Sequence, residues 1–302
     1  MSKHLLKNAI QALLTIICLL SSTLGLWAQE TQAPATKERH IFTLGEIEVK
    51  DSSELNKNVT VDTINGEQIR EFNANRLPNA LDLIPGVTVT GGGRRNEKGI
   101  FVRGFSTSRV PVFLDGIPIY VPYDRTFDFD RFTTFDLSEI VVSKGFTSVL
   151  YGPNTMGGAI NMVSRKPVKS FEGDVGAGYG SGDTYYGYTN VGTNQKKWYL
   201  EAGASDYNRD YYPMSNKFDP TSIQARGQRI ESYSKDYKVN FKVGFTPAEG
   251  HEYALGYIQQ HGEKGDPPDV RSASAGGDTK YWLWPRWDKT TTYLTTDTPI
   301  MD

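Results

Sequence analysis

The sequence predicts a mixed α/β domain followed by antiparallel strands of a membrane β-barrel. Three observations support this fold class: short strands and turns around one helix in residues 58–167, apolar/polar alternation in residues 168–302, and loops of unequal length between the later strands. The 302 residues carry 33 Lys and Arg against 35 Asp and Glu, and 38% of them are hydrophobic. This composition excludes a bundle of transmembrane helices, and the balanced charge argues against nucleic-acid binding.

Residues 1–28 have the three parts of an export signal. Lys3 and Lys7 give a basic start, an interrupted apolar stretch follows, and small residues lead to an expected cleavage between Ala28 and Gln29. The alternative is an N-terminal membrane anchor, but the stretch is shorter than the ~20 apolar residues that a span needs. We therefore expect export and removal of this segment.

The cysteine and histidine content argues against an enzyme. Cys18, the only cysteine, lies in the export signal, so the mature chain would have no disulfide, thiolate metal site or cysteine nucleophile. No two of His40, His251 and His261 have the spacing of helical metal ligands. Residues 128–130 (DFD) hint at a calcium loop but lack its glycine and terminal glutamate. We expect no catalytic residue, no metal ligand and no cofactor.

Residues 29–57 are polar and lack apolar periodicity, which predicts a flexible arm. Within this arm, residues 44–50 form a short alternating, β-prone segment. Two interpretations are open: an edge strand of the next domain, or a peptide that adds a strand to a partner's sheet. Composition alone favours the edge strand.

Residues 58–167 predict a compact mixed α/β domain. Residues 77–84 are expected to form a short helix that Pro85 and Gly86 end, and Asp115-Gly116 predicts a tight hairpin between two apolar runs. Short strands are expected at residues 87–90, 100–103, 112–114, 117–120, 140–143 and 160–164.

Residues 168–302 predict amphipathic antiparallel strands. Strands are expected at residues 171–180, 184–193, 197–207, 235–245, 251–260 and 281–295. A soluble antiparallel sandwich shows the same alternation. The connections favour a barrel, because apart from the first hairpin the long polar loops 208–234 and 261–280 alternate with the short turns 194–196 and 246–250. That asymmetry is typical of outer-membrane barrels.

Four stretches of the α/β domain resemble, in order, the plug domain of TonB-dependent outer-membrane receptors. They are residues 80–87 (ALDLIPGV), 100–105 (IFVRGF), 114–118 (LDGIP) and 140–163, which end in SVLYGPNTMGGAINMV. Two positions depart from the family: Phe146 follows Lys144-Gly145 where proline is usual, and Ser138 precedes Glu139 where a basic residue is frequent. The strands after Pro167 are similar to the start of the family's barrel.

The resemblance implies a passive receptor with an external energy source. Family members bind scarce, bulky ligands at the cell surface, most often ferric siderophores and sometimes cobalamin, haem or glycans. The expected partners are TonB of the inner-membrane complex, a ferric siderophore that brings its own chelated iron, and outer-membrane lipid. The family's TonB box falls on Glu46, Ile47, Glu48, Val49 and Lys50. This position favours the docking interpretation of the arm.

The resemblance also implies site residues on plug loop tips that face outward. The expected ligand contacts are Arg94, Arg95, Ser108, Arg109, Tyr120, Tyr123, Asp124 and Arg125. Guanidinium groups and tyrosine hydroxyls suit an anionic, oxygen-rich chelate, whereas the plain alternative is a set of solvated loop residues. Arg103 aligns with a plug arginine that pairs with barrel acids. We expect it to have a structural or gating role, with a partner beyond Asp302.

The length predicts an incomplete barrel. A plug of ~110 residues needs the lumen of about 22 strands, because side chains alone fill a barrel of eight. Six strands cannot enclose it, so we expect the N-terminal part of a longer receptor. The alternatives are a receptor for cobalamin, haem or a glycan, and a barrel adhesin or channel without active transport. A signal-transducing variant is disfavoured, because residues 29–45 leave no room for a further periplasmic domain.

Overall fold

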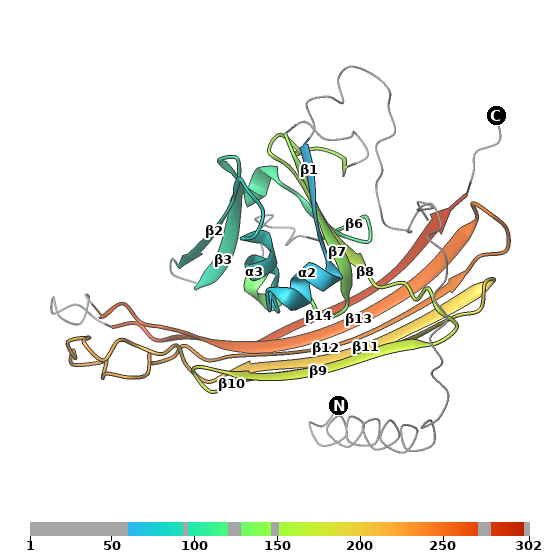
Figure 1. The fold of residues 1–302 in the computed structure, drawn as a ribbon. Helices are drawn as coiled ribbons and strands as arrows, with labels where there is room; N and C mark the ends of the chain where they lie inside the picture. Colours follow the sequence, from blue (N-terminus) through green and yellow to red (C-terminus); the bar gives the residue numbers. More distant parts are fainter. Residues whose placement is uncertain (1–59, 93–95, 120–127, 146–150, 271–278, 299–302) are drawn as a thin grey trace, which may run out of the picture. The chain divides into compact units, whose positions relative to one another are not determined.

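A computed structural model of the chain describes residues 60–92, 96–119, 128–145, 151–270 and 279–298. These residues form three sheets (Figure 1), with strand orders β1-β7-β8-β5-β6, β2-β3-β4 and β14-β13-β12-β11-β10-β9. The first two sheets belong to the plug domain, residues 58–167. We call the six-stranded sheet the wall.

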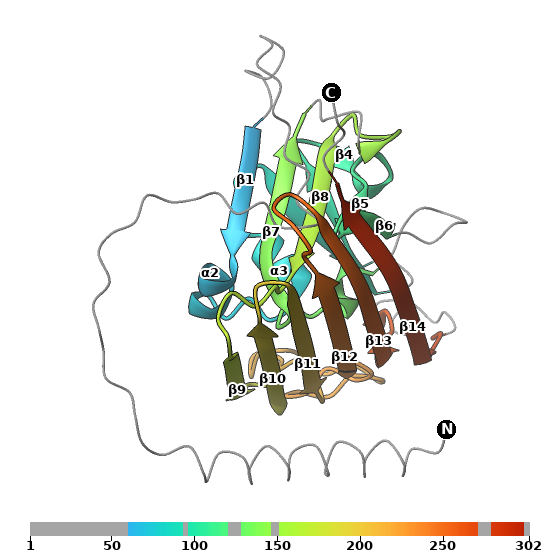
Figure 2. The same ribbon diagram turned by 90° about the vertical axis from the view of Figure 1, so that its right-hand side faces the viewer.

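The plug strands lie close to their predicted positions, with two additions. The bounds are β1 (Thr60–Asn65), β2 (Val87–Gly92), β3 (Glu97–Val102), β4 (Phe105–Ser106), β5 (Val112–Leu114), β6 (Ile117–Ile119), β7 (Leu137–Lys144) and β8 (Gly158–Ser164). β5 pairs with β8 in parallel, and the other pairs are antiparallel. The five strands of the larger sheet lie side by side in Figure 2. Ile100, Ile140 and Ile160 are at most 1% exposed in the core between the sheets.

The plug helices are short and begin at recognisable signals. α2 (Gly66–Glu71) starts with a capping box, in which the Asn65 side chain accepts from the Gln68 N–H at 2.9 Å and the Gln68 side chain accepts from the Asn65 N–H at 3.0 Å. α3 (Leu77–Leu81) has proline in its first turn and ends three residues before the predicted end. Two 3-10 turns follow, η2 (Thr107–Arg109) and η3 (Phe129–Arg131). No helix within the described ranges is long and apolar enough to cross a membrane.

The wall confirms the six predicted strands. They are β9 (Glu172–Gly180), β10 (Thr184–Asn194), β11 (Trp198–Arg209), β12 (Ser234–Phe245), β13 (Glu252–Asp266) and β14 (Trp282–Asp297), each antiparallel to its neighbour. β13 ends six residues later than predicted. Its last residues pair with the start of β14 past an irregularity between Gly262 and Lys264, so the predicted loop 261–280 begins as strand.

The wall turns polar side chains toward the plug and apolar side chains away from it. On β12, Asp236, Lys238 and Lys242 are at most 6% exposed, whereas Phe241 and Phe245 are 40% and 52% exposed. A soluble sandwich would bury the phenylalanines and expose the charges. The observed faces are those of an outer-membrane barrel strand, polar inside and apolar outside. This pattern excludes the sandwich interpretation.

The outward apolar face has the height of a membrane band. Next to the short turns, Trp198, Phe245 and Tyr253 lie opposite one another on three adjacent strands and make an aromatic row. Toward the long loops, the row through Tyr237 and His261 brings polar side chains to the same face. The two rows are eight residue steps apart, about 26 Å along the strand. With both rows included, each strand gives nine residues to this band, which agrees with the ~9–11 residues of a tilted transmembrane strand.

Four tyrosine rings on the inward face lie over glycines directly across on the next strand. The pairs are Tyr188 with Gly176, Tyr186 with Gly178, Tyr199 with Gly244, and Tyr293 with Gly256. A Cβ at any of these glycines would lie between 2.0 and 2.5 Å from the ring. Glycine therefore makes room for the ring, and the ring covers a strand surface that has no side chain of its own.

Candidate functional site

The candidate functional site is the contact between the plug domain and the wall, where residues far apart in sequence form buried ion pairs. β12 and β13 present four charged side chains to the plug, and each pairs with an opposite charge. The pairs are Asp236 with Arg76 and Arg131, Lys238 with Asp136, Lys242 with Asp115, and Lys264 with Asp128. Every one of these side chains is at most 7% exposed. We call this set the ionic contact.

Asp115 joins the plug hairpin to two wall strands. It has a φ of +50° and precedes Gly116 with a φ of +77°, so the two residues form the tight turn between β5 and β6 that the sequence predicts. The turn aims the carboxylate at the wall. It accepts hydrogen bonds from the Ser164 N–H (2.8 Å) and Ser164 hydroxyl (2.6 Å), from Lys242 Nζ (3.0 Å) and from the Tyr293 hydroxyl (2.6 Å). The buried charge is therefore fully satisfied.

Asp236 holds two plug arginines. Its carboxylate lies 2.7 Å from Arg76 Nη2 and 2.8 Å from Arg131 Nη1. Both guanidinium groups also donate to the Ser234 hydroxyl, at 3.1 and 2.6 Å. Burial lowers the pKa of Arg76, but the carboxylates of Asp130 and Asp236 more than offset this, so the pKa lies above its ordinary value. The charge of Arg76 is therefore permanent.

The remaining ionic pairs hold residues 128–136, the segment before β7, against the wall. Lys238 pairs with Asp136 and donates to the Thr133 carbonyl at 2.9 Å. Lys264 lies 2.6 Å from Asp128, whose other oxygen caps η3 by accepting from the Asp130 N–H. The carboxylates of residues 128–130 are thus engaged with cations and backbone groups of the protein itself, and within the described residues no cluster of His, Cys, Asp and Glu could hold a metal ion.

The contact with β10 is different in kind, and we call it the aromatic contact. Phe135 of the plug lies between Tyr186 and Tyr188, with ring centroids 5.5 and 4.8 Å away. The Tyr186 hydroxyl donates to Asn73 Oδ1 at 2.9 Å, and Asn190 Nδ2 donates to the Phe135 carbonyl at 3.0 Å. Stacking and neutral hydrogen bonds therefore hold the plug here.

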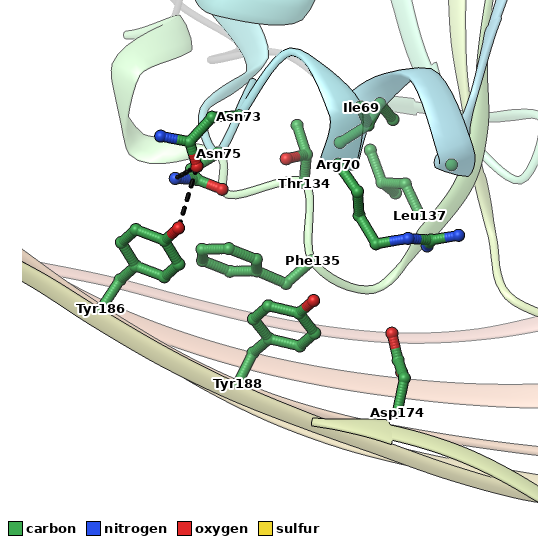
Figure 3. A pocket seen from close by; sticks show the side chains of 11 residues that line it. Ile69, Arg70, Asn73, Asn75, Thr134, Phe135, Leu137, Asp174, Tyr186 and Tyr188 are labelled. Carbon is green, nitrogen blue, oxygen red and sulfur yellow. Dashed lines mark hydrogen bonds between the residues drawn. The ribbon is translucent and has the colours of Figure 1, made fainter. Parts of the chain in front are cut away.

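A pocket lies beside the aromatic contact, between α2 and the strands β9 and β10. Figure 3 shows Tyr186 and Tyr188 rising from β10 and Asp174 from β9 toward the plug. Arg70 of α2 lies on the opposite side. The pocket thus combines aromatic surface, hydroxyls and both signs of charge, which suits a polar, oxygen-rich molecule.

Of the predicted site residues, the structure describes Arg103, Ser108 and Arg109. Arg103 is exposed with a φ of +49°, and its guanidinium donates to the Thr60 hydroxyl at 3.0 Å. Its gating role stays a prediction. Ser108 and Arg109 are exposed in η2, and the Ser108 hydroxyl lies 3.0 Å from that of Ser106. The other predicted positions lie outside the described residues: the cleavage point at Ala28, the TonB box at 46–50, and Arg94, Arg95, Tyr120, Tyr123, Asp124 and Arg125.

Asn96, directly before β3, lies at the long-loop end of the wall. Asn96, which follows the predicted contacts Arg94 and Arg95, donates to the Gly265 carbonyl at 3.3 Å and accepts from Lys264 Nζ at 2.6 Å. β13 ends there and leads into a long connection. Because long loops of outer-membrane barrels face outside, this is the outward end of the wall.

The ionic contact was not predicted from the sequence. In the sequence, Asp115 has the role of a turn residue, and Lys238 and Lys242 belong to the polar face of the strand expected at residues 235–245. A lysine that faces a barrel lumen needs a counter-charge, so the alternation itself contained a signal. The partner could not be found from sequence, because Lys238 and Lys242 lie 102 and 127 residues from their carboxylates.

The chain is similar in sequence and in fold to known proteins. Residues 53–159 match the TonB-dependent Receptor Plug Domain family. The chain is 32% identical over 184 residues to the vitamin B12 transporter BtuB of Vibrio cholerae serotype O1, a match that covers 61% of this chain and 28% of the relative. It is 29% identical over 129 residues to the ferripyoverdine receptor of Pseudomonas aeruginosa, a match that covers 42% of this chain and 15% of that receptor. Among solved structures, the copper transporter OprC superposes with a TM-score of 0.61 and 18% identity over 80% of this chain and 34% of that one.

These observations first define a class: a plug domain packed on antiparallel strands with the faces of an outer-membrane barrel. The chain is, more particularly, similar to the TonB-dependent receptors, and residues 53–159 match the plug domain of that family. The chain spans 28% of the length of the Vibrio cholerae relative. The named relatives are transporters and receptors, which agrees with the expectation that the protein is not an enzyme.

Proposed function

We propose that this chain acts in a receptor that takes up a bulky ligand through the outer membrane, with energy supplied by TonB. The observation that carries the proposal is the buried ionic contact, which fixes a folded domain against the polar face of a membrane wall. A domain held in this way blocks free diffusion, so passage needs work on the plug. The outer membrane offers neither ATP nor a useful potential, so the work must arrive through a periplasmic partner.

The location belongs to the same proposal. The expected export signal at residues 1–28 supports passage out of the cytoplasm, and the apolar outward face of the wall supports insertion into the outer membrane. Sequencing the amino terminus of the protein from the outer-membrane fraction should give Gln29 as the first residue. A protein that keeps Met1, or that stays in the soluble fraction, would contradict this part of the proposal.

TonB coupling is tested by deletion within the arm. Removing residues 46–50 should abolish uptake and leave ligand binding intact, because the segment would add a strand to TonB and does not touch the ligand. A matched deletion of residues 32–36 in the same arm should change neither. Uptake that survives the first deletion would contradict coupling to TonB and would favour an adhesin or a channel.

For the ligand we propose a ferric siderophore. The predicted tip residues Arg94 and Arg95 suit an anionic, oxygen-rich chelate, and the position of Asn96 supports an outward tip. A second candidate is cobalamin, because the 184-residue match to the vitamin B12 transporter is longer than the plug domain. We expect calorimetry to show tight binding of one ferric chelate from a panel of a tris-hydroxamate, a tris-catecholate and cyanocobalamin. Binding of cyanocobalamin alone would replace the first candidate with the second.

A further inference from the structure

Two of the four tyrosines that cover glycines are locked to carboxylates, and two are not. Tyr199 donates to Glu252 at 2.7 Å and Tyr293 donates to Asp115 at 2.6 Å, and the two residues are 1% and 7% exposed. Tyr186 and Tyr188 are half-buried. Tyr186 donates to the neutral Asn73, and the hydroxyl of Tyr188 makes no hydrogen bond with the described residues. The second pair is therefore free to turn without leaving a buried charge unpaired.

The inward face of β9 under the free pair is formed by two glycines. A Cβ at Gly176 or Gly178 would meet the ring of Tyr188 or Tyr186. If the rings swing away, a smooth backbone surface is left beside the plug. Under Tyr199, by contrast, the ring is fixed by Glu252, which itself pairs with Lys166 at 2.6 Å.

The pocket lies beside Tyr186 and Tyr188 and is lined by polar groups from both the plug and the wall. Arg70 and Asn73 come from the plug, and Asp174 comes from β9. Asp174 pairs with Arg165, and their side chains are 27% and 22% exposed. Every pair of the ionic contact is better buried than this one. A gap here separates aromatic contacts, neutral hydrogen bonds and a partly solvated ion pair, whereas a gap at β12 would leave buried charges without partners.

We propose that the ligand passes between the plug and strands β9 and β10, and that the rings of Tyr186 and Tyr188 close this route when no force acts on the plug. Phe135 sits between the two rings and holds them in the closed position. The ionic contact stays formed during passage and keeps the plug in register with β12 and β13. This inference rests on the proposed function, because it assigns a route to the transport proposed above.

Cysteine labelling in the full receptor tests the route. The only cysteine of this chain, Cys18, lies in the predicted export signal. After removal of the signal, an introduced cysteine would be the only thiol of this chain that can be labelled. Thr134→Cys places a thiol on the plug side of the route, and Asn190→Cys places one on β10; both side chains are buried, and both variants keep Phe135 and the two tyrosine rings. The control is Asn240→Cys, which faces the plug on β12 and is 9% exposed.

Intact cells receive a membrane-impermeant maleimide together with the ferric tris-hydroxamate, the ferric tris-catecholate or cyanocobalamin. Labelling of Thr134→Cys and Asn190→Cys should rise severalfold in energised cells over cells whose proton gradient has been collapsed. Asn240→Cys should stay unlabelled in both.

Three results would count against the inference. Labelling of Asn240→Cys together with the other two means that the plug leaves the wall on all sides. Uptake without labelling of Thr134→Cys and Asn190→Cys means that the ligand takes another route. Absence of uptake of all three compounds by the unaltered receptor contradicts the proposed function, and the route fails with it.

Discussion

The plug meets the wall in two regions built from different chemistry. At β12 and β13 the contact consists of buried ion pairs centred on Asp236, Lys238, Lys242 and Lys264. At β10 it consists of the Phe135 ring held between two tyrosines. Both regions lie on the polar face of one sheet and touch one domain. The difference between them therefore reflects how each is held and how each can be released.

A buried ion pair and an aromatic stack respond differently to displacement. Separating two buried charges leaves each without water or partner, so the contact resists small movements and then fails abruptly. Stacked rings lose contact gradually and can slide, because dispersion is spread over many atoms. The ionic contact is therefore suited to fix the register of the plug, and the aromatic contact is suited to yield.

The largest expected effect comes from breaking the ionic contact at its centre. Asp236→Ala leaves the guanidinium groups of Arg76 and Arg131 buried without their shared carboxylate. We expect a loss of about 3–5 kcal/mol in the free energy of unfolding. Urea unfolding of the receptor in lipid vesicles, followed by tryptophan fluorescence, measures it.

A matched control lies on the outward face of the same two strands. Glu263 pairs with Lys235 at 3.1 Å, and the two side chains are 31% and 47% exposed. Glu263→Ala should lose only ~0.2–1 kcal/mol, because solvent screens the pair. Equal losses in Asp236→Ala and Glu263→Ala would mean that the ionic contact does not stabilise the fold through buried charge.

A smaller effect is expected from filling the glycine under a tyrosine, and it should differ between the two regions. Gly244→Ala brings a Cβ to 2.0 Å from the ring of Tyr199, which is held by Glu252. Because the ring cannot move aside, we expect a loss of about 1–3 kcal/mol in the free energy of unfolding. Gly178→Ala meets the half-buried ring of Tyr186, which can shift, so the loss should stay below ~1 kcal/mol. The same urea titration compares the two, and a larger loss for Gly178→Ala would contradict the idea that Tyr186 is free to move.

Local pattern predicted most of the fold. The six wall strands follow from strict alternation, which a strand of a half-polar sheet must show, and the hairpin at Asp115-Gly116 follows from its turn residues. The elements missed include β1 and α2. β1 is an edge strand in which only Ile64 is buried, so it has no apolar alternation to detect. The start of α2 was present in the sequence as the capping pair Asn65 and Gln68.

The candidate site was less predictable, because its pairs depend on tertiary register. Nothing near Asp115 in sequence indicates that Lys242 and Tyr293 will meet it, since both belong to strands whose stagger is set by the whole sheet. Sequence alternation does not say which face of a strand is buried, so it fits both a barrel and a sandwich. The structure decides for the barrel faces, because Lys242 is buried and Phe241 is exposed. The loop tips Arg94 and Arg95 stay a prediction that rests on resemblance.

The smallest expected effect comes from removing one hydroxyl in each region. Tyr293→Phe takes one of four hydrogen bonds from the buried carboxylate of Asp115, which keeps Ser164 and Lys242. We expect a loss of ~1 kcal/mol in the free energy of unfolding. Tyr186→Phe removes only the hydrogen bond to the exposed Asn73, which water replaces, so the loss should be ~0.5 kcal/mol or less. Because both variants keep the ring over its glycine, any difference between them in urea unfolding reports the hydroxyl alone. Equal losses would show that Tyr186 is locked as firmly as Tyr293, and the β10 contact could then not be the part that yields.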